Sequence, residues 1–130
     1  LRELAGILGI GEEALDSEEK VLSGCRELRK KYGCDIICTM EQRGSVFCGS
    51  EGEYYVGTAQ VPLCGFSGAG DTYLAAYLYK RYVARVDPAA SLAYAAAAAG
   101  AKVALPGTGL PTALQIEEIY KAGITVRPAK

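Results

Sequence analysis

The stretch GFSGAGDT, residues 65–72, is a glycine-rich turn that leads directly into a long helical pattern. Its small residues Gly68, Ala69 and Gly70 let backbone N–H groups converge, and the positive end of a helix dipole adds to their field. The stretch therefore predicts an anion hole at the start of a helix, with the carboxylate of Asp71 at its mouth.

Simple phosphate binding does not account for Asp71, because its carboxylate would repel a bound phosphate. Phosphoryl transfer does, since it needs donors around the transferred group and an acceptor for the proton of the attacking hydroxyl. On this interpretation the amides of Gly68, Ala69 and Gly70 form the anion hole and Asp71 is the catalytic base. A turn that only caps its helix is the commoner explanation of a glycine motif taken alone.

Helices and strands alternate on both sides of this turn. Apolar spacing and glycine stops predict helices near residues 1–8, 16–33, 71–82, 87–103 and 112–121. Short apolar runs predict strands near residues 34–39, 45–48, 53–57, 60–63 and 124–126. This order predicts an α/β fold with a mainly parallel sheet, helices on both faces and a hairpin edge near residues 45–56.

The segment Gly-Ala-Gly-Asp before a long helix resembles the second signature of the ribokinase-like (PfkB) carbohydrate kinases, which has the form Asp-Thr-x-Gly-Ala-Gly-Asp. The resemblance implies a three-layer α/β/α fold, with ATP and Mg²⁺ as cofactors. It also implies that Asp71 deprotonates the acceptor hydroxyl and that the preceding amides stabilise the transferred phosphoryl group.

Three weaker matches follow the same family order. Leu-Arg-Glu at residues 1–3 is similar to the end of the family's Asn-x-x-Glu, which implies that Glu3 helps to place the ATP-bound Mg²⁺. Thr39 and Gly44 match a Thr-x-Gly-x-x-Gly segment that approaches ATP, with Glu41 in place of its middle glycine. Gly107 begins a Gly-Thr-Gly loop where such kinases approach the adenine. Taken singly, each match is equally explained by an ordinary turn or helix end.

Two positions depart from the family pattern. Gly65-Phe66 replaces the leading Asp-Thr, which leaves a monovalent cation site without its usual residues, and Ser67 is the next residue expected near the nucleotide. An asparagine common at the start of the family's alanine-rich helix is replaced by Tyr94 or Ala96, depending on the alignment. Nucleotide preference is therefore left open.

The resemblance covers only the carboxy-terminal part of a family member. Residues 1–130 are expected to be the nucleotide-binding part of a larger kinase domain whose acceptor-binding part and lid are absent, with little phosphorylation by this chain alone. The expected partners are a small sugar or sugar phosphate, together with a missing amino-terminal half or a second copy of the chain.

The composition of the chain narrows the classes of partner and of site that remain possible. A net charge of -1, with the basic residues dispersed, predicts no nucleic-acid partner, and no apolar run is long enough to predict a membrane span. The chain has no histidine, which excludes histidine-based dyads and metal sites. Five cysteines without a Cys-x-x-Cys pair favour a reducing, cytoplasmic setting.

Two other functions remain open from the residues. Vitamin kinases that act on hydroxymethylpyrimidine or pyridoxal share the architecture of the sugar kinases. A non-catalytic nucleotide-binding or assembly module would account for the lost Asp-Thr pair and the missing lobe.

Overall fold

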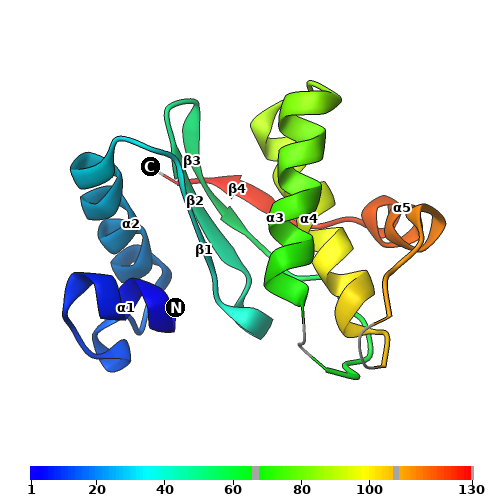
Figure 1. The fold of residues 1–130 in the computed structure, drawn as a ribbon, viewed down its shortest axis with the longest axis horizontal. Coiled ribbons are helices and arrows are strands. Elements are labelled where there is room, and N and C mark those ends of the chain that lie inside the picture. Colours follow the sequence, from blue (N-terminus) through cyan, green and yellow to red (C-terminus); the bar gives the residue numbers. More distant parts are fainter. Residues whose placement is uncertain (66–67, 107–108, 130) are drawn as a thin grey trace. The chain divides into compact units, whose positions relative to one another are not determined.

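Figure 1 shows the fold in a computed structural model, which describes residues 1–65, 68–106 and 109–129. The chain divides into two compact units. One comprises Leu1–Tyr55 with Arg127–Lys130, and the other is Val56–Val126.

The first unit begins with two helices whose ends are set by local residues. Helix α1 (Arg2–Leu8) stops at Gly9, which has a left-handed φ of 71°. Helix α2 (Glu18–Tyr32) starts where the Ser17 hydroxyl accepts a hydrogen bond from the Lys20 N–H at 3.2 Å, and it stops at Gly33 with φ 67°. Glycine adopts this conformation without steric cost, so it ends helices efficiently. The two helices expected near residues 1–8 and 16–33 are confirmed.

A four-stranded sheet has its strands in chain order, β1-β2-β3-β4. The strands are β1 (Ile36–Thr39), β2 (Ser45–Gly49), β3 (Gly52–Val56) and β4 (Val126–Pro128). Strands β1 and β2 pair antiparallel, from Ile36 opposite Cys48 to Thr39 opposite Ser45. A short 3-10 helix, η2 (Glu41–Arg43), lies between them.

The recorded β1–β2 pairing is antiparallel, because only five residues join the two strands and a parallel crossover needs about a dozen or more. One expectation for the strands needs correction: the strand expected at residues 60–63 does not form. Pro62 in that segment has no N–H to donate to a sheet. The hairpin expected near residues 45–56 is confirmed by β2 and β3.

The core of the first unit lies between its helices and its sheet. Helix α2 packs against β1 and β2, as Figure 1 shows. The buried apolar residues of this core are Leu4, Ala5, Leu15, Val21, Leu22, Cys25, Leu28, Cys38, Met40, Val46 and Cys48. Burial of this set is the main source of stability for the unit.

The second unit is built on three helices, α3 (Ala69–Leu78), α4 (Pro88–Val103) and α5 (Ala113–Ala122). Helix α4 packs against both of the others. Half of its buried residues are alanines, whose small side chains let neighbouring helices approach closely. A π-helical turn, η3 (Tyr79–Val83), continues α3. In the described residues, no helix combines the length and the apolar character that a membrane span requires.

Side chains determine where α4 and α5 begin. The Asp87 carboxylate accepts a hydrogen bond from the Ala90 N–H at 3.1 Å, and Pro88 occupies the first turn. Thr112 and Gln115 form a reciprocal capping box at the start of α5. The helix starts expected at these positions are confirmed.

Candidate active site

The glycine turn of the sequence forms the start of helix α3 in the second unit. Gly68 is the N-cap residue, with φ 78° and ψ 4°, a conformation that favours glycine. The Thr72 N–H donates to the Gly68 carbonyl at 2.9 Å. The N–H groups of Ala69, Gly70 and Asp71 come before this bond, so they have no acceptor within the helix. Gly68 and Gly70 are exposed, so an anion can approach these amides.

Asp71 lies in the first turn of α3, beside these amides, and its side chain is solvent-exposed. The N-cap residue of α3 is Gly68, which has no side chain, so this helix begins without a side-chain cap, in contrast to α4 with Asp87. This geometry is compatible with a carboxylate that accepts a proton from a bound acceptor.

A buried lysine adjoins the same turn. Lys102, in the last turn of α4, is only 4% exposed, and its Cε lies 3.2 Å from the point where a Cβ would stand at Gly68. The Val103 carbonyl, also at the end of α4, accepts hydrogen bonds from the N–H groups of Cys64 and Gly65 at 2.7 and 3.3 Å. The end of α4 and the start of α3 therefore meet at this turn.

Sequence reasoning missed Lys102. The available signal was its position as the single charged residue in an otherwise uncharged run, residues 92–103. A charged residue on such a helix lies in solvent if the helix is at the surface, and in the core if the helix is buried. The apolar periodicity of the sequence alone did not distinguish these two locations.

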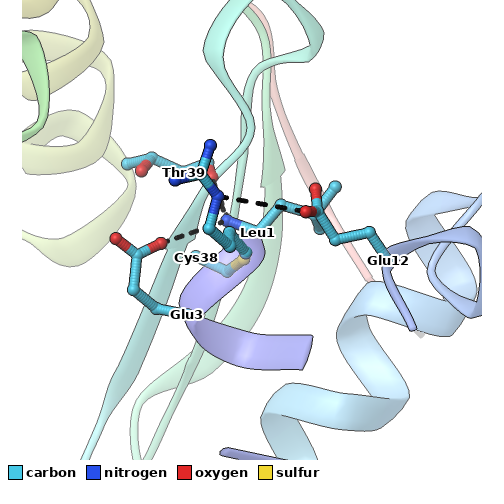
Figure 2. Close-up of polar contacts among 6 residues, drawn as sticks. Leu1, Glu3, Glu12, Cys38 and Thr39 are labelled. Carbon is cyan, nitrogen blue, oxygen red and sulfur yellow. Dashed lines mark hydrogen bonds and ion pairs between the residues drawn. The ribbon is translucent and has the colours of Figure 1, made fainter. Parts of the chain in front are cut away.

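Glu3 and Thr39 lie close together in the first unit, at the start of α1 and the end of β1. The Leu1 nitrogen lies between them: it donates to the Thr39 carbonyl at 3.1 Å and lies 3.9 Å from a Glu3 carboxylate oxygen (Figure 2). The Glu3 side chain is 90% exposed, so its carboxylate is available to solvent.

Gly44 closes the turn that follows β1. The Met40 N–H donates to the Gly44 carbonyl at 2.8 Å, and Gly44 has φ 94° and ψ -149°. Glu41, where the family has its middle glycine, also has a positive φ, of 53°. The turn thus keeps a conformation that suits glycine although a glutamate occupies the position.

The remaining expected contacts are only partly placed. Ser67 and Gly107 lie outside the described residues. Tyr94 already has neighbours in the second unit: the Lys80 ammonium lies 4.3 Å from its ring centroid, and the Tyr120 ring meets it edge-on at 5.7 Å. Tyr94 is one of the two positions, with Ala96, that can correspond to the family's asparagine, and its side chain differs from asparagine in shape and polarity.

Residues 1–114 match the family model described as pfkB family carbohydrate kinase. The chain belongs to this family. Bifunctional protein HldE of Mesorhizobium japonicum is 28% identical over 122 residues, which are 93% of this chain and 23% of that protein.

Solved structures of the family share the fold. Phosphofructokinase-2 of Escherichia coli, crystallised in complex with substrates and products, matches with a TM-score of 0.81 and 20% identity, over 93% of this chain and 38% of that one. Ribokinase of Thermotoga maritima matches with a TM-score of 0.69 and 17% identity, over 76% and 34%. The expected ribokinase-like α/β fold is confirmed, and the chain spans about two fifths or less of the length of these relatives.

Proposed function

We propose that this PfkB-family chain is the nucleotide-binding part of a kinase that transfers a phosphoryl group from ATP to a hydroxyl of a sugar or sugar phosphate. The observation that carries the proposal is the start of α3, where exposed amides and the exposed carboxylate of Asp71 occupy the same helical turn. A larger kinase domain with a separate acceptor-binding part and lid belongs to the proposal, as does a reducing, cytoplasmic setting, which the five unpaired cysteines support.

Each residue of the proposed site has one role. The amides of Ala69 and Gly70, with the Gly68 turn that directs them, stabilise negative charge on the transferred group. Asp71 accepts the proton of the acceptor hydroxyl. Thr39, Gly44, Ser67 and Gly107 contact the nucleotide.

Glu3 has the character needed to help hold Mg²⁺ that arrives with the nucleotide. Magnesium keeps several of its waters and binds through one or two carboxylates plus substrate phosphates. Glu3 provides one exposed carboxylate, and no group of three or more metal-ligating side chains occurs among the residues that the structure describes. When bound, the ion would neutralise charge on the phosphates. A monovalent cation is left out of the proposal because Gly65 replaces the family's aspartate.

A second candidate is a nucleotide-binding module without catalysis. The observation that favours it is the loss of the leading Asp-Thr pair ahead of the glycine turn. Within the catalytic proposal, a vitamin such as hydroxymethylpyrimidine or pyridoxal is the alternative acceptor to a sugar.

Replacement of Asp71 by asparagine separates these candidates. In the complete gene product that contains residues 1–130, we expect Asp71→Asn to lower kcat for ATP-dependent phosphorylation about 100- to 10,000-fold, because the base is lost. Affinity for Mg-ATP should stay the same or rise, because a negative charge beside the phosphates is removed. Steady-state kinetics over a panel of sugars, sugar phosphates and vitamins, with calorimetric Mg-ATP titration, measures both quantities.

Asp87→Asn is the matched control. Asp87 is an exposed aspartate at the start of α4, and asparagine caps a helix as well as aspartate does. It should leave kcat unchanged. Equal turnover in the Asp71→Asn protein and the unmodified protein would exclude Asp71 as the base, while Mg-ATP binding without turnover on any acceptor would favour the non-catalytic module.

A further inference from the structure

Lys102 is the one charged residue buried within the described part of the chain. Burial of an ammonium group is costly because the charge loses its hydration, so lysine is rarely found this deep. The five other described lysines are exposed or half-buried. A charge kept at this position therefore calls for a physical reason.

The lysine side chain runs toward the start of α3. Its Cε stands 3.2 Å from where a Cβ would be at Gly68, and the ammonium nitrogen is one bond further along. Gly68 thus leaves room for the lysine stem as well as providing the left-handed N-cap. Lys102 also interacts within the chain.

The ends of two helices explain why a positive charge is needed here. The carbonyl end of α4 carries a partial negative charge, and it adjoins the start of α3 through the bonds from Cys64 and Gly65 to Val103. Without compensation, the α4 end would weaken the positive field of the α3 amides. The Asp71 carboxylate in the first turn of α3 weakens it further.

We propose that Lys102 provides the positive charge of this site and binds the phosphate groups of a nucleoside triphosphate beside the α3 amides. The inference rests on the proposed function and deepens it. Lys102 offsets both the α4 carbonyls and Asp71, which resolves the conflict between an anion site and a neighbouring carboxylate.

The test is calorimetric titration of the complete gene product that contains residues 1–130 with three probes: Mg-ATP, inorganic tripolyphosphate and adenosine. Lys102→Met keeps the length and packing of the side chain and removes its charge. We expect it to weaken binding of Mg-ATP and tripolyphosphate about 10- to 100-fold, the effect of one charge-assisted hydrogen bond, and to leave adenosine binding unchanged. The dependence of tripolyphosphate affinity on salt should also become shallower.

Lys121→Met is the matched control, because Lys121 is an exposed lysine in the last turn of α5. It should bind all three probes like the unmodified chain. Lys102→Gln, also uncharged but polar, is measured in parallel, and thermal unfolding of each variant checks its fold. Loss of folding in both Lys102 variants, or equal loss of adenosine and phosphate binding, would show a structural role and overturn the inference.

The outcomes separate the inference from the proposed function. If both folded Lys102 variants bind tripolyphosphate as tightly as the unmodified chain, the role of Lys102 is overturned while the kinase site survives. If the unmodified chain binds neither Mg-ATP nor tripolyphosphate, the site itself is overturned together with the inference.

Discussion

Glu41 has a backbone φ of 53°, in the left-handed region that costs an ordinary residue about 1 kcal/mol. The residue is exposed, and its conformation follows from the turn that Met40 and Gly44 close. The positive φ at this position is a conformation that glycine adopts without strain, which explains why the family motif has a glycine here. At the scale of single residues, a departure from a family motif need not mean a departure from its geometry.

A pair of glycine substitutions tests this strain. We expect Glu41→Gly to raise the free energy of unfolding by about 0.5 kcal/mol, since relief of the left-handed strain outweighs the extra freedom of glycine in the unfolded chain. Gln42→Gly, at an exposed neighbour with a negative φ, should lower it by about 0.5–1 kcal/mol. Urea denaturation measures both, and equal destabilisation by the two changes would contradict the prediction.

At the scale of elements, helices in this chain begin in two ways. Helices α2, α4 and α5 start with a side-chain oxygen that accepts a backbone hydrogen bond, from Ser17, Asp87 and Thr112. Helix α3 starts with Gly68 and has no such cap among the described residues. A start without a cap gives up stability that a cap would supply, and it leaves amides available to a ligand.

The capping box of α5 gives the element-scale prediction. The Gln115 N–H donates to the Thr112 hydroxyl at 3.2 Å, and the Thr112 N–H donates to the Gln115 side chain at 2.8 Å. Thr112→Ala should therefore destabilise the protein by about 1 kcal/mol, whereas Thr112→Ser should cost much less. Thermal or urea unfolding provides the comparison, and an alanine variant as stable as the serine variant would show that the box contributes nothing.

At the scale of the whole molecule, the free energy of unfolding depends on pH in the acid range, because carboxylates are paired with basic side chains. Arg26 on α2 makes a two-pronged contact with Glu53 on β3, at 2.6 and 2.9 Å. The hydrogen bonds from Arg26 hold the pKa of Glu53 below its ordinary value of 4.5. The stabilisation is therefore fully present above the unfolded-state pKa and is lost as pH falls through the lowered folded-state pKa.

The expected size of this effect is modest because both side chains are partly exposed. We expect the pair to contribute under about 1 kcal/mol at pH 7 and almost nothing at pH 2. Urea unfolding of the unmodified protein and of Glu53→Gln at both pH values measures it. The stability difference between the two proteins should shrink on acidification, and a difference that is constant with pH would rule out this pairing as its cause.

The sequence by itself determined the local features: helix ends at Gly9 and Gly33, the cap at Asp87, and the glycine turn that begins α3. Each depends on residues only a few positions apart, so its signal lies in the sequence. The motifs were also sufficient to indicate the family. The match of residues 1–114 to the family model then showed it.

Tertiary structure decided the burial of Lys102 against Gly68, because that contact depends on how two segments distant in the sequence pack together. A lysine in an alanine-rich helix has the same local pattern whether it lies in solvent or in the interior, and only the packed neighbours establish which.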